Sequence, residues 1–161
     1  MDYINKQECM SDFYKVKVEF FVNTKCQEQL LVSAITGTNI DSKVKLYFKS
    51  AFGINPLSIL SVKKSEIVCF LGNPDADFLY ICKLEFICTN MEKPKRRVIA
   101  VGANTINKAL EAIDKAFEDI TTIKKLILSE RQLKILEYND EIEYIDYVVE
   151  GIVRCDMSYV E

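Results

Sequence analysis

The chain has 161 residues, of which 49% are hydrophobic and 28% are charged, so it can bury a core and is not a disordered tail. Its net charge of −3 argues against bulk binding to a polyanion and leaves room only for a local basic patch. With no histidine and no Cys-x-x-Cys pair, the sequence offers little to a zinc site or to the commonest general base.

The first predicted elements are two strands that form an antiparallel hairpin. Apolar residues alternate with polar ones over residues 13–22, which is typical of a half-buried strand. A polar break at 23–25 separates it from a second apolar run at 29–35.

A helix and two short strands are predicted next. Thr38 or Asn39 can cap the helix, and Gly53 is placed to end it. The runs at 57–62 and 67–71 are then strand-like. The turn-forming stretch 72–77 (GNPDAD) marks a boundary between two parts of the chain.

The second part repeats the order of the first. Strands are predicted at 78–89 and 96–101, followed by a helix that Asn104 caps. The stretch 14–20 (YKVKVEF) recurs 66 residues later at 80–86 (YICKLEF). The same offset relates the apolar helix positions Ile40, Val44, Tyr47 and Ala51 to Ile106, Leu110, Ile113 and Phe117. A constant spacing across strand and helix patterns predicts one supersecondary unit used twice.

The last strand of the second unit has two candidate positions. An offset of 66 places it at 122–128, whereas an offset of 90 places it at 147–157. We favour the second position, which implies an inserted segment at 121–145. In that segment a capping-box pattern at 129–132 predicts a short helix through Leu136.

These elements predict an α+β fold in a single domain, 1–161. The first unit covers 12–71, and the second covers 78–120 plus 146–158. Two β-β-α-β units would join in a two-layer sandwich with a mostly antiparallel sheet and both helices on one face.

We expect a cytoplasmic protein without a membrane partner. The polar N-terminus does not resemble a signal peptide. No apolar run approaches the roughly 18–20 residues of a membrane-spanning helix. The six cysteines are then expected to be reduced, as small core residues.

The order of elements resembles the family known as domain of unknown function 4494. Four stretches carry the resemblance: 13–18 (FYKVKV), 30–34 (LLVSA), 80–87 (YICKLEFI) and 146–149 (DYVV). The resemblance implies an uncharacterised protein of Bacteroidetes or their phages. It implies the fold and a cytoplasmic or phage context, and it brings no known catalytic residue.

A basic cluster, consisting of Lys93, Lys95, Arg96 and Arg97, falls at the second hairpin. Together with outward-facing Lys15, Lys17 and Lys83, it could follow a phosphate backbone. The alternative interpretation is a solvated hairpin whose charges guard against edge pairing.

An acidic, tyrosine-bearing segment follows the second helix. Its predicted interaction residues are Tyr138, Asp140, Glu141, Glu143, Tyr144 and Tyr147. Polar surfaces with aromatic anchors are typical of protein interfaces. The alternative is an ordinary solvated segment.

Two further patterns have both a chemical and a structural interpretation. Asp75 and Asp77 could hold a hard cation, but their Asn-Pro-Asp-Ala-Asp context favours a turn. The stretch 102–104 could bind an anion at a helix start, but it fits an ordinary strand–helix turn better. We therefore assign no catalytic residue, metal ligand or cofactor.

The sequence thus predicts a small non-enzymatic binding protein that acts through protein–protein contacts and forms a homo-oligomer. The alternatives are a nucleic-acid-associated protein that uses residues 93–97 and, less favoured, an enzyme that works without histidine.

Overall fold

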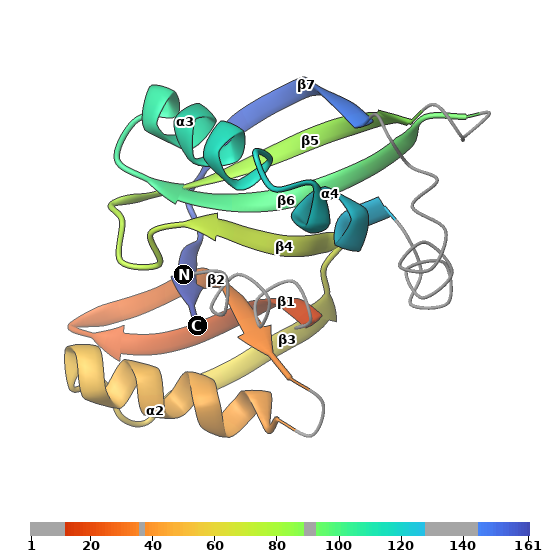
Figure 1. Ribbon diagram of the computed structural model, residues 1–161. Coiled ribbons are helices and arrows are strands. Elements are labelled where there is room, and N and C mark those ends of the chain that lie inside the picture. The colour runs from red at the N-terminus through yellow and green to blue at the C-terminus, as the bar shows by residue number, and fades with distance from the viewer. Residues whose placement is uncertain (1–11, 36–37, 89–92, 128–144) are drawn as a thin grey trace.

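The computed structural model describes residues 12–35, 38–88, 93–127 and 145–161. The described residues form two four-stranded sheets (Figure 1). The first sheet contains, in spatial order, β3 (Ser58–Lys64), β1 (Asp12–Val22), β2 (Thr24–Ala34) and β8 (Ser158–Val160). The second sheet contains β4 (Ile67–Gly72), β6 (Lys95–Ala103), β5 (Phe78–Cys88) and β7 (Ile145–Cys155).

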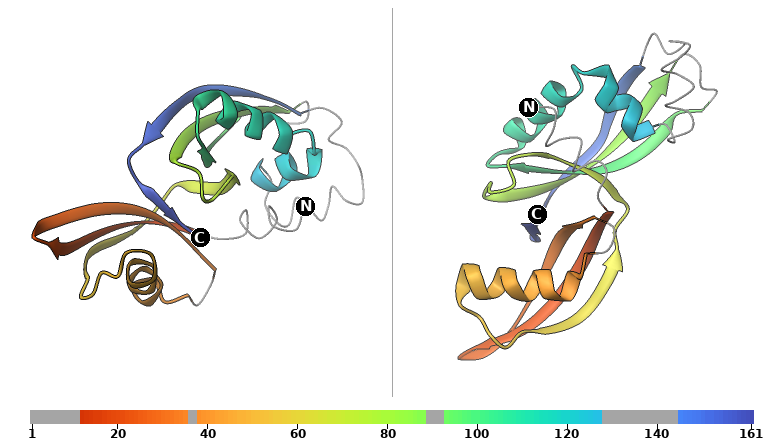
Figure 2. Two further views of the ribbon diagram at one scale, coloured as in Figure 1. Left: turned by 90° about the vertical axis from the view of Figure 1, so that its left-hand side faces the viewer. Right: turned by 60° about the horizontal axis from the view of Figure 1, so that its bottom comes forward.

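Each sheet carries its own helix layer. Helix α2 (Ile40–Phe52) packs on the first sheet, and α3 (Ile106–Ala116) and α4 (Ile120–Ile127) pack on the second (Figures 1 and 2). The predicted mixture of helices and strands is confirmed. The predicted two-layer form with both helices on one face is not confirmed, because the strands divide into two sheets that lie between the helix layers.

Three apolar clusters explain this layering. Alternate residues of β1 and β2, among them Val16, Val18, Phe20 and Leu30, pack against Val44 and Phe48 of α2. Alternate residues of β5 and β6, among them Cys82, Leu84, Phe86 and Ile99, pack against Ile113 of α3. The third cluster joins the sheets and contains Phe13, Leu31, Ile67, Phe70, Leu79, Ala100 and Met157. Because both sheets have this second apolar region, they bury it by facing one another.

The two parts of the chain exchange a strand. β4 follows β3 along the chain but leaves the first sheet and pairs in parallel with β6, with Ile67 opposite Val98. β8 follows β7 but pairs in parallel with β2, with Leu30 opposite Ser158. Each sheet is therefore completed by a strand from the other part of the chain.

The pairings in the two sheets correspond position by position. Tyr14 faces Lys64 in the first sheet, and Tyr80 faces Arg154 in the second. The β1–β3 pairing shifts register after Lys17, and the β5–β7 pairing shifts at the equivalent Lys83. The offsets are 66 residues for β1 and β5 and 90 for β3 and β7.

The final strand of the second part is therefore the one predicted at 147–157. It forms as β7, whereas residues 120–127 form helix α4. The helix predicted over 129–136 lies outside the described residues.

The helix ends follow local side-chain chemistry. The Asn39 side chain accepts a hydrogen bond from the backbone N–H of Ser42, and Gly53 ends α2 in the left-handed conformation, as predicted. Thr105, rather than the predicted Asn104, caps α3 by accepting from the N–H of Lys108. The Asn104 side chain instead accepts a hydrogen bond from the N–H of Asp77 at 3.0 Å.

The cysteines do not all match the expectation of reduced thiols. Cys26, Cys82 and Cys155 are free. Burial raises the pKa of the Cys82 thiol to about 11, which makes it a poor nucleophile at neutral pH. Cys69, which is fully buried in β4, is disulfide-bonded, so the prediction is wrong at that position.

Candidate functional site

The predicted basic cluster divides between the two faces of the second sheet. Lys93 is exposed just before β6, while Lys95, Arg96 and Arg97 are its first three residues. Arg96 lies opposite Glu85 on the face that points away from α3. Part of this face, at Leu79 and Ala100, packs against the first sheet, and the remainder is here called the open face. Arg97 lies on the helix side, where its Nε donates to the backbone oxygen of Leu126 at 2.7 Å.

On the open face, four charged residues come together from three strands. The Nε of Arg96 donates to Oε1 of Glu150 at 3.2 Å, and Lys83 lies on the same face. Glu85 and Glu150 are hydrogen-bonded to one another. We call Lys83, Glu85, Arg96 and Glu150 the charged cluster.

The pKa values of the two carboxyl groups in the charged cluster are shifted in opposite directions. The hydrogen bond with Glu150, together with some desolvation, raises the pKa of Glu85 above its usual range. The same hydrogen bond and the charge of Arg96 lower the pKa of Glu150. Glu85 therefore loses its proton at a higher pH than Glu150 does.

A groove of about 530 Å³ opens beside the charged cluster. It is lined by Glu66, Val68, Lys83, Arg96, Arg97, Val98 and Glu150. Its lining combines three cations with two carboxylates, so it is not a continuous basic track. A groove of mixed charge suits a polar, charge-matched partner better than a uniform polyanion.

Exposed apolar side chains surround the charged cluster on the open face. Ile87 is 45% exposed, Val148 is 49% exposed and Val153 is 67% exposed. Val148 lies opposite Glu85, and Val153 lies opposite Ile81, which places both valines on the open face of the edge strand β7. Apolar side chains beside a set of charges resemble the composition of a protein-binding surface.

Of the predicted acidic interaction residues, only Tyr147 is among the described residues. Tyr138, Asp140, Glu141, Glu143 and Tyr144 lie outside them. The Tyr147 ring packs on the helix side, 4.9 Å from that of Phe117 between centroids, and its hydroxyl donates to Oδ1 of Asp114. Desolvation and this hydrogen bond to a carboxylate raise the Tyr147 pKa well above its usual range.

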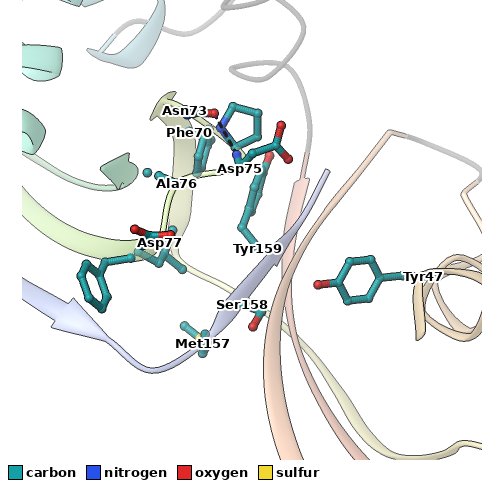
Figure 3. Close-up of a pocket in the computed structure, with 13 residues that line it drawn as sticks. Tyr47, Phe70, Asn73, Asp75, Ala76, Asp77, Met157, Ser158 and Tyr159 are labelled. Carbon is teal, nitrogen blue, oxygen red and sulfur yellow. Dashed lines mark hydrogen bonds between the residues drawn. The ribbon is translucent and has the colours of Figure 1, made fainter. Parts of the chain in front are cut away.

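A second cleft, of about 310 Å³, lies between the sheets (Figure 3). One wall is the turn from Asn73 to Asp77, and the others are β8, Phe70 and the Tyr47 side chain of α2. The turn is held by its own side chains, since the N–H of Asp75 donates to Oδ1 of Asn73 at 2.9 Å. Asp75 and Asp77 are exposed, in agreement with the turn interpretation of this stretch.

Two glycines allow this turn to lie close to the second sheet. A Cβ on Gly102 would come within 2.0 Å of the Asn73 backbone oxygen, and one on Gly72 within 2.4 Å of the Gly102 oxygen. Gly72 also has a φ of +86°, which favours glycine. The turn therefore packs directly on the stretch 102–104, which forms a strand–helix connection as expected.

Sequence reasoning missed the charged cluster. It singled out Arg96 for its neighbours in sequence, whereas the ion-pair partner Glu150 is 54 residues away. The signal that could have found it was the offset of 90, which places Glu150 in the strand next to Glu85.

The family model of a domain of unknown function (DUF4494) matches residues 12–138. The chain belongs to this family. The match covers every described element from β1 to α4, and β7 and β8 follow it. Neither a curated protein nor a solved structure matches the chain. Among the described residues, no helix of this family member has the length and apolar character to cross a membrane.

Proposed function

We propose that this chain is a small, non-enzymatic protein that works by binding other protein chains through the open face of its second sheet. The observation that carries the proposal is a pair of differences between the equivalent edge strands β3 and β7. Ser58 and Lys63 in β3 correspond to Val148 and Val153 in β7. At these two positions polar side chains on one edge strand are matched by exposed valines on the other, while β3 exposes Leu60 and Val62 elsewhere.

This difference between the two edge strands favours binding at β7. Proteins commonly protect edge strands with charged residues, as Lys63 does in β3. Exposed valines on an edge strand have the opposite effect, because they favour association. The nearby charged cluster would then select the partner by charge complementarity.

We also propose that the two parts of the chain are copies of one β-β-α-β unit. The common strand order and the common position of the register shift support this proposal. On this view β3 and β7 derive from the same strand and have diverged at the positions of these valines.

A binding role accounts for the charged cluster better than catalysis does. The sequence lacks histidine, and the Glu85–Glu150 pair lies on an open sheet face. An enclosed site that expels water strengthens the electrostatic interactions used in catalysis, and an open sheet face provides no such enclosure. We therefore place the function in recognition.

The test compares three versions of the chain in its source cells by cross-linking and mass spectrometry. Ile87→Lys places a charge on the open face, while Val22→Lys changes a comparably exposed residue, 53%, in β1. We expect the amount of cross-linked protein to fall by about 10-fold with Ile87→Lys, which is the effect of losing about 1.4 kcal/mol of binding free energy. The amount of cross-linked protein should be unchanged with Val22→Lys. The same set at the same level for all three chains would contradict the proposal.

Nucleic-acid binding is the second candidate, and the convergence of Lys83, Arg96 and Arg97 on one groove favours it. However, Arg96 and Arg97 already bond to Glu150 and Leu126 within the chain. A mobility shift that weakens with salt and disappears in Lys95→Glu plus Arg96→Glu would establish this candidate. No shift at low salt would eliminate it.

A further inference from the structure

Among the described residues, strand β7 leaves one of its edges unpaired. It lies at the end of the second sheet, and within the described residues it pairs only with β5. We infer that β7 pairs in an antiparallel manner with β7 of a second copy, about a two-fold axis between Glu150 and Gly151. The inference rests on the proposed function and deepens it by naming the partner. The product is a continuous eight-stranded sheet.

The register follows from the irregularity in β7. On the C-terminal side, Gly151 is opposite Lys83 and therefore lies on the open face. On the N-terminal side, Val149 is opposite Leu84 and lies on the helix face. The side-chain alternation is thus reversed across Glu150. Val148 and Val153 share the open face, and Val149 and Ile152 share the helix face.

Only some registers keep these faces consistent in an antiparallel pair. Residues directly opposite one another must lie on the same face of the sheet. With the axis between Glu150 and Gly151, Val148 faces Val153 of the second copy, and Val149 faces Ile152 of the second copy. A shift of one residue would place Val148 opposite Ile152, which is on the other face.

The proposed register covers the valines that distinguish β7 from β3. Val148 meets the second copy's Val153 on both sides of the axis, which forms two apolar cross-strand contacts. These residues are 49% and 67% exposed in the single chain. Glu150 lies next to the axis, where the small Gly151 of the second copy leaves it room.

Charge complementarity supports the same register on the helix face. Tyr147 lies opposite Arg154 of the second copy. Its hydroxyl donates to the carboxylate of Asp114, which therefore lies beside the arriving guanidinium. In the single chain, Arg154 covers the exposed Phe78 ring at 4.6 Å from the ring centroid. Two symmetric Arg154–Asp114 ion pairs would form across the interface.

The first experiment measures self-association by light scattering and sedimentation equilibrium. We expect the wild-type chain to have twice its mass of 18.5 kDa at high concentration. Val148→Lys plus Val153→Lys should raise the dimer dissociation constant by at least about 10-fold, the effect of about 1.4 kcal/mol. The matched Val22→Lys should leave it unchanged. A monomeric wild type, or equal constants for all three chains, would overturn the inference.

The second experiment tests the register. Asp114→Arg and Arg154→Glu should each weaken the dimer, because each places like charges together. The two changes combined in one chain should restore it, since the ion pair is re-formed with its signs reversed. A dimer that the combined variant does not restore would overturn the register. Circular dichroism confirms that each variant is folded. A monomeric wild type that still loses cross-linked partners with Ile87→Lys would leave the proposed function standing.

Discussion

The ring of Tyr159 in β8 stacks on the ring of Phe70 in β4, with centroids 3.9 Å apart and planes within 3° of parallel. These two residues belong to the two strands that the parts of the chain exchange. The contact therefore joins both exchanges at one point between the sheets, and Phe70 is fully buried there.

Removing the Phe70 ring should lower the stability of the folded chain. Because Phe70→Ala leaves a cavity between the sheets, we expect the free energy of unfolding to fall by about 3–5 kcal/mol in a denaturant titration. Phe21→Ala is the control, since Phe21 is 71% exposed, and it should change stability by no more than about 0.5 kcal/mol. Equal effects of the two substitutions would show that the rings do not hold the sheets together.

The close approach of the turn to Gly102 yields a second prediction. Gly102→Ala would force a methyl group against the Asn73 oxygen and the Phe70 ring, so we expect a loss of about 1–3 kcal/mol. Gly151→Ala meets no atom within 4 Å and should be neutral or slightly stabilising. Both are measured by thermal unfolding in the Val148→Lys plus Val153→Lys background, so that self-association does not contribute. Similar losses at both glycines would contradict the packing described.

The charged cluster makes a directional prediction about Glu85. Its pKa is raised by the hydrogen bond and charge of Glu150 and lowered by the charge of Arg96. Glu150→Ala should therefore bring the Glu85 pKa down toward its ordinary value, whereas Arg96→Ala should raise it further. Carboxyl carbon chemical shifts followed by NMR against pH would report both changes. Shifts of the same sign in the two variants would mean that the cluster does not act as described.

The Tyr147–Asp114 contact predicts how stability falls in alkali. The Tyr147 pKa is raised in the folded chain above the value of about 10 of an unfolded tyrosine. Above pH 10 the unfolded state therefore loses this proton first, and stability decreases as the pH rises toward the folded pKa. Tyr147→Phe should make this decrease shallower.

The alkaline effect is measured as the denaturation midpoint at several pH values between about 8 and 11. Tyr3→Phe is the control that removes a tyrosine elsewhere in the chain. If Tyr147→Phe and the wild type lost stability with the same slope, the raised pKa of Tyr147 would be refuted.

Local pattern was sufficient to predict most of the elements. Alternation over Tyr14 to Phe20 and over Tyr80 to Phe86 predicts β1 and β5, because the side chains of one face pack on a helix while the others face away. The offset of 90 identifies β7 correctly. Cap identity was harder, because Asn104 and Thr105 are both good caps. Thr105 is the cap because the Asn104 side chain already accepts a hydrogen bond from the backbone N–H of Asp77.

Sheet membership and the charged cluster depend on pairings that a local pattern does not contain. Residues 67–71 form an apolar run, which is typical of a strand buried on both faces, but the run does not specify which sheet the strand joins. Arg96 and Glu150 likewise come together only after β5 has paired on both sides. These features are therefore seen only in the assembled sheets.

The exchange of β4 and β8 has a consequence for synthesis on the ribosome. The first sheet is made almost entirely from the first 64 residues, yet the strand that completes it is translated after every other described element. A nascent chain would therefore expose the free edge of β2 until β8 emerges. We expect that this edge is where a chaperone would bind during translation, and that folding finishes as one late event.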